Sequence, residues 1–304
     1  MINLEVVSVI ASIILVFGFG YGAKKLGIVK KEDAHVLNNI IIYIALPALI
    51  FMAIYRAKLS VSFLYVSAIA LLTTSILVGL AYLAARFLKL DKTLTGTFML
   101  VAAVGNTGYI AYPLLISLFG EKGFVRGIFY DMFGTVIFML TAGLFICARY
   151  GGGSEKPPIL RQLLTFPPLL ALVLGFLFKA VVLPDVLIKS FDIMAAVTVG
   201  LILISVGIYL EPAKGARKYY PLIGLAFFYK LLLSPMIALG LASAFKIQPL
   251  SINTTVLSAS MPTALLALIF GIKYRLNVEF MASAVFILTV SSIVTVPVIQ
   301  ILLT

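Results

Sequence analysis

Two short runs place proline beside glycine, asparagine, serine and threonine inside stretches that are otherwise apolar. The first run is GNTGYIAYP, residues 105–113, and the second is SASMPT, residues 258–263. In lipid an unpaired backbone group costs several kcal/mol, so a broken helix persists only where protein or a water-filled cavity re-satisfies it. We therefore interpret both runs as helix breaks of the kind that bind substrate in secondary transporters.

The first break offers several groups that could hold a ligand. Asn106 supplies both hydrogen-bond donors and acceptors, and beside unwound backbone it can hold a carboxylate or a coupling ion. Pro113 has no amide N–H and so frees the carbonyl of Tyr109, four residues earlier. The alternative is a kink supported by neighbouring helices, which membrane helices tolerate.

The second break centres on Pro262, whose neighbours carry hydroxyl groups. These hydroxyls can pair with freed backbone or face a cavity, and packing alone is the alternative for Ser258 and Ser260. If both helices break at the midplane, two half-helix N-termini direct partial positive charge at their meeting point, which favours an anion. We expect substrate contacts from Asn106, Thr107, Gly108, Tyr109, Lys230, Ser260, Pro262 and Thr263, and helix breaks at Gly105, Pro113, Met261 and Pro262.

Two ionisable residues lie within apolar stretches. Asp131 could exchange a proton or hold a cation, because an intramembrane carboxylate is a functional hypothesis by default. Its alternative is a solvated acid near the outer interface, shortly after Arg126. Lys230 is about ten residues, or ~15 Å, from either end of its stretch, farther than a lysine stem can snorkel. We expect Lys230 to pair with Asp131 or to neutralise an anionic substrate.

The composition defines the class of protein that must position these residues. The chain has 304 residues, of which 62% are hydrophobic and 11% charged, and its mean hydropathy is +1.18. Soluble domains are closer to half apolar and a quarter charged, so we expect an all-α polytopic membrane protein with no sizeable soluble domain. The net charge of +12 comes from lysines and arginines in short loops, which indicates membrane topology and not nucleic-acid binding.

Catalytic and cofactor chemistry finds little support in the sequence. A single cysteine excludes a disulfide framework or a cysteine-ligated metal, and there is a single histidine. No Gly-x-x-x-x-Gly-Lys-Ser/Thr phosphate loop occurs. We expect no enzyme activity, no metal and no cofactor.

Runs of about 20 apolar residues are long enough to cross a bilayer. We expect ten such spans, at 4–23, 36–55, 62–86, 94–119, 124–149, 159–181, 191–210, 219–245, 250–271 and 279–302. The linker at 151–158 divides the chain into two five-span halves, 1–150 and 151–304, which together form one membrane domain. The start of the chain lacks the basic region of a signal peptide, so the first apolar stretch is interpreted as a retained span.

The basic residues predict the orientation of these spans. Most linker lysines and arginines follow odd-numbered spans, so the positive-inside rule places those linkers in the cytoplasm and both termini outside the cell membrane. Because each half has an odd number of spans, the second half enters from the opposite side. The expected fold is a 5+5 inverted repeat with broken, crossing helices four and nine.

Three motifs resemble the auxin efflux carrier family, which includes the plant PIN auxin exporters and bacterial malonate-type permeases. They are Gly-Asn-Thr-Gly-Tyr-x-x-x-Pro-Leu at 105–114, Leu-Pro-Ala at 46–48 and Ser-Met-Pro-Thr at 260–263. The resemblance implies a fold similar to bacterial bile acid sodium symporters, in which a transport subdomain moves elevator-like against a scaffold. It also implies a homodimer.

The resemblance assigns roles to individual residues. Asn106 matches the crossover asparagine of the PIN carriers and Pro262 their span-nine crossover proline. Asp131 falls where they carry a polar residue in span five, and Lys230 where they carry an arginine in span eight. The chain departs from the PIN carriers at three places. Ile50 stands where they have serine, Gly105 stands at the first half of their paired-proline crossover, and the linker at 151–158 is short where many of them have a long hydrophilic loop. These departures favour a small organic acid over auxin as the substrate.

The function expected from these features is secondary active transport of a small organic anion, with Asp131 as the candidate residue for proton coupling. Sodium coupling of the bile-acid-symporter type is an alternative, with backbone carbonyls, Asn106 and hydroxyls as ligands. A passive channel would need a continuous polar lining, and only isolated polar positions occur. A non-transporting receptor is the remaining alternative, although it gains nothing evident from two symmetry-related breaks. The expected partners are the organic anion and the lipid bilayer, with no nucleic acid.

Overall fold

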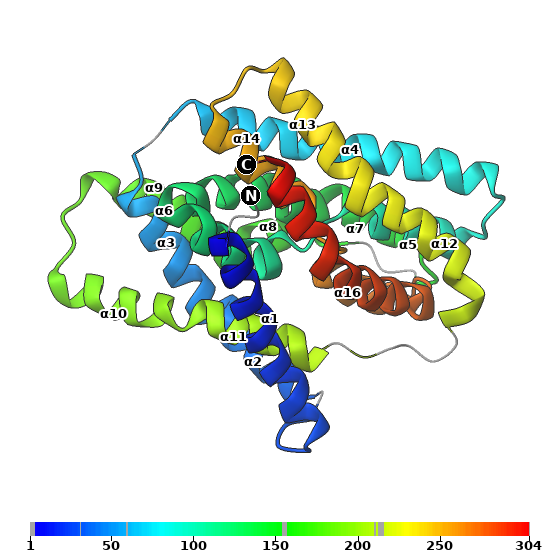
Figure 1. The fold of residues 1–304 in the computed structure, drawn as a ribbon, viewed down its shortest axis with the longest axis horizontal. Coiled ribbons are helices and arrows are strands. Elements are labelled where there is room, and N and C mark those ends of the chain that lie inside the picture. Colours follow the sequence, from blue (N-terminus) through cyan, green and yellow to red (C-terminus); the bar gives the residue numbers. More distant parts are fainter. Residues whose placement is uncertain are drawn as a thin grey trace.

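The computed structural model describes residues 4–30, 32–58, 60–153, 157–209, 211 and 216–303, and these residues are predominantly helical (Figure 1). The first half of the chain contains α1 (Leu4–Lys25), α2 (Asp33–Ile40), η1 (Ile41–Ala45), α3 (Leu46–Arg56), α4 (Ser62–Phe87), α5 (Lys92–Ala103), η2 (Thr107–Ala111), α6 (Tyr112–Asp131), η3 (Met132–Ile137), η4 (Met139–Gly143) and α7 (Leu144–Tyr150). The second half contains α8 (Ile159–Thr165), α9 (Pro167–Leu177), η5 (Phe178–Ala180), α10 (Asp185–Ala196), α11 (Thr198–Tyr209), η6 (Ala216–Tyr219), α12 (Tyr220–Phe227), η7 (Phe228–Leu233), α13 (Ser234–Ala244), α14 (Pro249–Ala259), α15 (Leu265–Lys273) and α16 (Val278–Leu303). The elements η5 and η6 are 3₁₀ turns, and the other η elements are π-helical.

Several helical stretches are long and apolar enough to cross a membrane. Six such stretches occur among the described residues: Asp33–Arg56, Ser62–Phe87, Thr107–Tyr150, Asp185–Tyr209, Ala216–Ala244 and Val278–Leu303. The pair Ile159–Thr165 and Pro167–Ala180, bent by 55°, makes a seventh if it is one span. The chain is therefore a multi-pass, all-helical membrane protein, and the count of ten spans stays a prediction.

The number of uninterrupted membrane-length stretches is smaller than the ten predicted spans because some helices are broken and others are joined. Neither α5, with 12 residues, nor α14, with 11, is long enough to cross by itself. Conversely, the helical stretch Thr107–Tyr150 has 44 residues, about twice what one crossing requires. Its helical path is interrupted at Gly120, whose φ of +59° is a left-handed conformation that glycine adopts without steric cost. Gly120 lies between the predicted spans 94–119 and 124–149.

Three of the π-helical turns have a common cause in proline. The turns η1, η2 and η7 end two residues before Pro47, Pro113 and Pro235, respectively. Proline cannot donate a backbone hydrogen bond and its ring crowds the preceding turn, so the helix widens there to re-satisfy its carbonyls. Two of these turns contain residues singled out by the sequence, Thr107 to Tyr109 in η2 and Lys230 in η7.

The helices pack as two groups. In the first, which we call the scaffold group (α1–α3 and α8–α11), α1 packs along α11, and α3 packs against α9 and α10. In the second, the core group (α4–α7 and α12–α16), α4 packs on α5, and α14 packs on α6 and α13. Figure 1 shows α1, α10 and α11 below, and α4, α12 and α13 above.

The scaffold group contains a lysine–glycine contact between α1 and α11. The Lys24 ammonium donates a hydrogen bond to the carbonyl oxygen of Ile208, at 2.7 Å, near the C-terminal end of α11. One turn earlier, Gly20 lies so close to the backbone of Ile204 that a Cβ atom would clash. The glycine therefore permits the close approach, and the lysine stabilises carbonyls at a helix C-terminus.

An equivalent contact joins α9 and α3. The Lys179 ammonium donates to the carbonyl oxygens of Ile54, at 2.9 Å, of Tyr55, at 3.1 Å, and of Ala57, at the C-terminal end of α3. Gly175, again four residues before the lysine, would place a Cβ atom 2.9 Å from the Ile54 Cβ. The same Gly-x-x-x-Lys pattern thus makes the same contact in both halves of the chain.

Candidate functional site

The two predicted breaks are observed, and they lie directly against each other. Helix α5 ends at Ala103 and η2 begins at Thr107, while α14 ends at Ala259 and α15 begins at Leu265. The intervening segments pair antiparallel, so each satisfies backbone groups that the other leaves free. The contacts are the bridge between Gly105 and Thr263, the Asn106 amide to the Pro262 carbonyl at 2.7 Å, and the Ala264 amide to the Val104 carbonyl at 2.9 Å.

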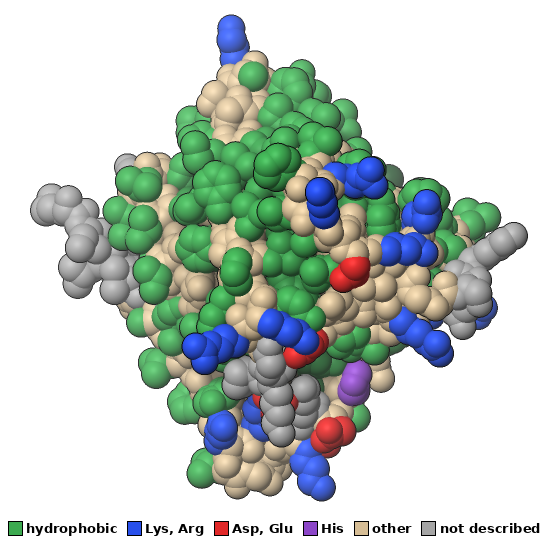
Figure 2. All heavy atoms as spheres, turned by 90° about the vertical axis from the view of Figure 1, so that its right-hand side faces the viewer, with side chains coloured by type: hydrophobic (Ala, Val, Ile, Leu, Met, Phe, Trp, Pro, Cys, Tyr) green, Lys and Arg blue, Asp and Glu red, His purple; other side chains and the backbone are tan. Residues whose placement is uncertain are grey.

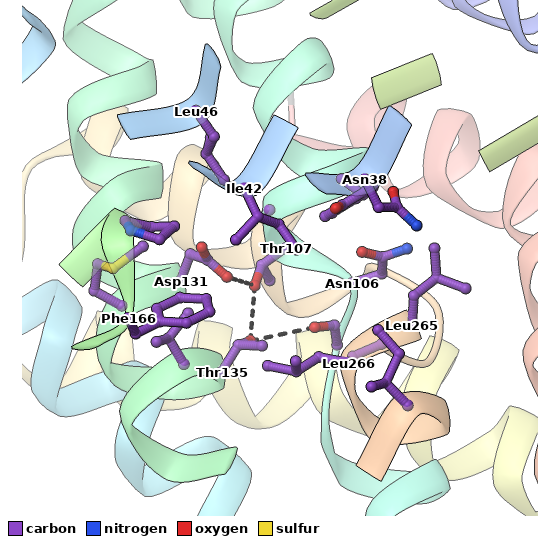
Figure 3. A pocket seen from close by; sticks show the side chains of 18 of the residues that line it. Asn38, Ile42, Leu46, Asn106, Thr107, Asp131, Thr135, Phe166, Leu265 and Leu266 are labelled. Atoms are coloured by element: carbon purple, nitrogen blue, oxygen red, sulfur yellow. Dashed lines mark hydrogen bonds between the residues drawn. The ribbon is translucent and has the colours of Figure 1, made fainter. Parts of the chain in front are cut away.

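A cavity with an empty volume of about 680 Å³ lies between these breaks and the scaffold group (Figure 3). The core group contributes residues 105–109 from the first break, 264–266 from the second, and Asp131 and Thr135. The scaffold group contributes Asn38, Ile42, Leu46, Phe166, Pro168 and Tyr209. The cavity is therefore at the junction of the two groups, where a relative displacement of the groups would change its access.

Asn106 is held by its backbone and leaves its side chain open to the cavity. Its amide donates to Pro262 and its carbonyl accepts from the amide of Ile110 at 3.1 Å. The residue is only 4% exposed, and the described structure gives its side-chain carboxamide no hydrogen-bond partner. Buried polar groups are normally paired, so an open carboxamide that lines a cavity indicates a ligand-binding group.

Asn38 contributes a second carboxamide from the opposite wall. It is 8% exposed, and its Oδ1 atom accepts a hydrogen bond from the Ser205 hydroxyl at 2.8 Å. That contact orients the amide and leaves the Nδ2 donors without a partner among the described residues. Two amide groups, Asn106 from the core group and Asn38 from the scaffold group, thus line the same cavity.

Asp131 is 3% exposed and joins a hydroxyl network beneath the first break. Its carboxylate accepts hydrogen bonds from the hydroxyls of Thr107 and of Tyr112, the latter at 2.7 Å. The Thr107 hydroxyl lies 2.7 Å from that of Thr135, which donates to the Gly105 carbonyl at 3.2 Å (Figure 3). The geometry favours an internal role for Asp131 over a solvated acid at the interface.

Lys230 lies behind the first break and not among the residues that line the cavity. It is 2% exposed, and its ammonium donates to the Ala259 carbonyl at 2.7 Å and to the Ser234 hydroxyl at 3.2 Å. Ala259 is the last residue of α14, so the cation stabilises a helix C-terminus. The expected pairing with Asp131 is not found, because the ammonium is already bonded on the other side of Gly105.

The hydroxyls of the second break bond to backbone. Ser258 donates to Thr254 and Ser260 to Leu257, each to a carbonyl oxygen at 2.7 Å within α14 or at its end. Thr263 donates to the Val101 carbonyl at 2.7 Å and so ties the two broken segments together. Met261 packs in a small apolar cluster with Leu257 and Leu114. The hydroxyl residues of the second break are therefore not among the residues that line the cavity, to which this region contributes residues 264–266.

Three residues of the site were not identified from the sequence, namely Asn38, Tyr112 and Thr135. A signal existed for Thr135, which follows Asp131 by four residues and so shares its helix face. Tyr112 directly precedes Pro113, and its sequence neighbours gave no indication that its hydroxyl bonds to Asp131. Asn38 lies in α2, near the start of the predicted span 36–55, where its carboxamide was not singled out.

The electrostatics of the cavity come from helix ends and one acid. Asp131 is the only Asp, Glu, Lys, Arg or His among the described residues that line it. The first residues of η2 and of α15, Thr107 and Leu265, also line it. Backbone amides at a helix N-terminus carry partial positive charge, so they are the groups available to an anion here.

A second cavity, with an empty volume of about 1110 Å³, extends this site toward one face of the molecule. It shares Asn106, Tyr209, Leu265 and Ile269 with the first cavity and reaches His35 and Glu211. Figure 2 shows lysine and arginine side chains gathered on the face that carries the single histidine. The site is thus connected to the basic face of the protein.

Helices long and apolar enough to cross a membrane, with two helix breaks beside a buried cavity that carries a few polar groups, are typical of a membrane transport protein. A family described as membrane transport protein matches residues 5–300. The chain is 35% identical to an uncharacterized transporter of Methanocaldococcus jannaschii, with 97% of each chain covered, and 35% identical to one of Methanothermobacter thermautotrophicus, with 95% of each covered. It is also 28% identical to a protein of Rhizobium meliloti named "Putative malonate transporter", over 86% of this chain and 84% of the relative.

The chain therefore belongs to the membrane transport protein family, the family of the auxin efflux carriers, and the predicted resemblance is confirmed. It is a membrane transporter by family and by its relatives.

Proposed function

We propose that the protein is a secondary active transporter that carries a small organic anion by alternating access. The observation that supports this most directly is Asn106, which is buried at the paired helix breaks and lines both the central cavity and the cavity that extends it. A ligand held there would contact both helix groups at once. Movement of one group against the other would then change the side from which the ligand is reached.

A carboxylate fits the groups that line the cavity. The amides at the starts of η2 and α15, together with the Asn106 and Asn38 carboxamides, supply hydrogen-bond donors. Such preorganised donors favour an anion without a lysine or arginine in contact with it. The relative named for malonate supports a small dicarboxylate as the first substrate to test.

Asp131 is proposed as the coupling residue. Its carboxylate contacts Thr107 of the first break, so a change in its protonation would reach the substrate site through one hydroxyl. A specific observation also supports sodium as the alternative. A chain of hydrogen bonds links the Asp131 carboxylate to the Thr107 hydroxyl, this to the Thr135 hydroxyl, and that to the Gly105 carbonyl, and hard cations prefer such oxygen ligands.

The architecture proposed for this mechanism is ten spans in a 5+5 inverted repeat, comprising residues 1–150 and 151–304. The repeated Gly-x-x-x-Lys contacts, from Gly20 and Lys24 to α11 and from Gly175 and Lys179 to α3, support it. In that arrangement the contact of the first span (α1) with the seventh (α11) is equivalent to the contact of the sixth span (α9) with the second (α3). The scaffold group would stay fixed while the core group moves, as in an elevator, and a homodimer would anchor the scaffold.

Both termini are proposed to lie outside the cell membrane, with the basic face in the cytoplasm. The cavity that reaches His35 and Glu211 then gives access to the site from the cytoplasm.

The proposal is tested by counterflow in proteoliposomes. Vesicles loaded with unlabelled malonate should accumulate labelled malonate transiently, because a carrier exchanges substrates and a channel does not. A sodium gradient and a proton gradient, imposed separately, identify the coupling ion. Equilibration without an overshoot would indicate a channel, and binding without flux would indicate a receptor.

A further inference from the structure

A separate cavity, lined in part by charged side chains, lies at the C-terminal end of α3, which is the end farther from His35. It has an empty volume of about 820 Å³, and Arg56, Lys58, Phe63, Glu121, Lys122 and Arg126 contribute to its wall. The stretch Asp33–Arg56 contains both His35 and Arg56, which at helical rise are ~30 Å apart. This cavity therefore lies at the far end of that stretch from His35, which is on the basic face of Figure 2.

Arg126 is buried in this cavity and has only neutral partners. The residue is 9% exposed. Its Nε atom donates to the Ser251 hydroxyl at 2.8 Å, its Nη1 atom donates to the Lys122 carbonyl at 2.7 Å, and its guanidinium carbon lies 5.5 Å from the centroid of the Phe63 ring. In the described part of the chain no carboxylate lies within ion-pair distance of it. A buried charge without a counter-ion is costly, so the site favours a bound anion.

The residues around Arg126 add positive charge. Arg56 is neutralised by Asp192, at 2.7 Å, and Glu121 is the only acid that lines the cavity among the described residues. Lys58 and Lys122 are exposed and contribute to its wall, and no described residue forms an ion pair with either of them. Cations therefore outnumber acids, and their field attracts anions from solution.

Aromatic rings pack beside this cavity, within α6 and between α6 and α4. The Tyr112 ring packs edge-on against Phe124 with centroids 5.0 Å apart, and Phe63 stacks on Phe129 at 4.7 Å. The two cavities share no lining residue, although Arg126 and Asp131 are only five residues, or ~7.5 Å, apart along α6. An anion at Arg126 is thus close to the central site but closed off from it.

We propose that Arg126, Lys58 and Lys122 form a second anion site that binds the substrate carboxylate at the outer mouth of the transporter, before it reaches the central cavity. The guanidinium provides charge-assisted hydrogen bonds of the geometry that a carboxylate accepts, and the two lysines draw the anion in from solution. The assignment of this site to substrate and to the outer face rests on the proposed function. The anion site itself rests on the contacts of Arg126.

Uptake kinetics test the two lysines. The double variant Lys58→Gln/Lys122→Gln should raise the KM for malonate uptake from outside about three- to tenfold at low salt, while kcat is unchanged. The effect should disappear at high salt, because exposed charges are screened. The control Lys25→Gln/Lys92→Gln removes two exposed lysines elsewhere and should leave KM unchanged. Equal KM values for the two double variants would overturn the role in transport.

Binding of malonate, measured by thermal stabilisation in detergent, tests Arg126. In an Asn106→Ala background binding at the central site is weakened, and a salt-sensitive stabilisation by malonate at the second site should remain. It should be lost when Arg126→Gln is added, or, if that variant does not fold, when the lysine pair is removed. Absence of any residual binding overturns the site, and stabilisation by phosphatidylglycerol alone assigns it to lipid headgroups and also overturns the proposal. If wild-type protein shows no malonate flux but the residual binding is present, the proposed function fails and the anion site stands.

Discussion

Substitution of Asn106 by alanine is the sharpest perturbation that the structure suggests. The backbone contacts of residue 106 with Pro262 and Ile110 do not involve its side chain, so they persist in the variant. The carboxamide makes no hydrogen bond with the described protein and is not needed for packing at the bridge. We therefore expect the melting temperature of the ligand-free protein to change little.

Ligand binding should respond very differently. A hydrogen bond to a charged group contributes about 1.5–3 kcal/mol. At about 1.4 kcal/mol per factor of ten, loss of one such bond weakens binding about 10- to 150-fold. The matched control is Asn39→Ala, which removes an exposed asparagine that does not line the cavity.

The assay is isothermal titration of malonate into purified protein, with ligand-induced thermal stabilisation as a second readout. Both readouts should show the loss in Asn106→Ala and none in Asn39→Ala. Wild-type affinity in Asn106→Ala would refute the placement of the substrate at the paired breaks. A large fall in stability without ligand would show instead that the carboxamide supports the fold.

Three further substitutions separate the roles of the buried polar residues. Asp131→Asn should abolish malonate uptake driven by a proton gradient while equilibrium exchange continues, and concentrative uptake in this variant would exclude Asp131 from coupling. Lys230→Met should lower the free energy of unfolding by about 1–3 kcal/mol, because it removes the hydrogen bond to the Ala259 carbonyl. The folded variant should nevertheless bind malonate with an affinity within about threefold of wild type. A tenfold weaker affinity would place Lys230 in contact with substrate. Gly175→Ala should destabilise the protein by about 1–3 kcal/mol, since the added Cβ would lie 2.9 Å from the Ile54 Cβ. The control Gly79→Ala, whose added Cβ meets no atom within 4 Å, should be neutral or stabilising. Equal melting temperatures for the two variants would refute the close packing of α9 on α3.

The class of the protein and its two helix breaks were predictable from sequence because both depend on local composition. Long apolar runs can only be membrane helices, and proline with glycine or asparagine interrupts a helix wherever it occurs. Asn106 and Asp131 could be singled out for the same reason, since a polar side chain in an apolar run must find a partner or a ligand. The resemblance to the auxin efflux carriers followed from these same motifs.

What the sequence could not decide was which polar groups remain open. Lys230, Ser258 and Ser260 have the chemistry of ligand-binding residues, but the fold turns each toward a backbone acceptor. Asn38 and Thr135 appear unremarkable in sequence, yet the packing of α2 and η3 brings them to the cavity wall. Satisfaction of a polar group depends on neighbours that are distant in the chain.

The sequence by itself determined that this chain is an all-helical membrane protein with two polar interruptions, because hydropathy and proline chemistry act over a few residues. Only the tertiary structure decided that the interruptions pair through Gly105 and Thr263, and that no described residue pairs with the Asn106 carboxamide or gives the buried Arg126 a counter-ion. Each of these depends on how segments far apart in the chain come together; Gly105 and Thr263, for example, are 158 positions apart, a distance across which no local pattern carries information.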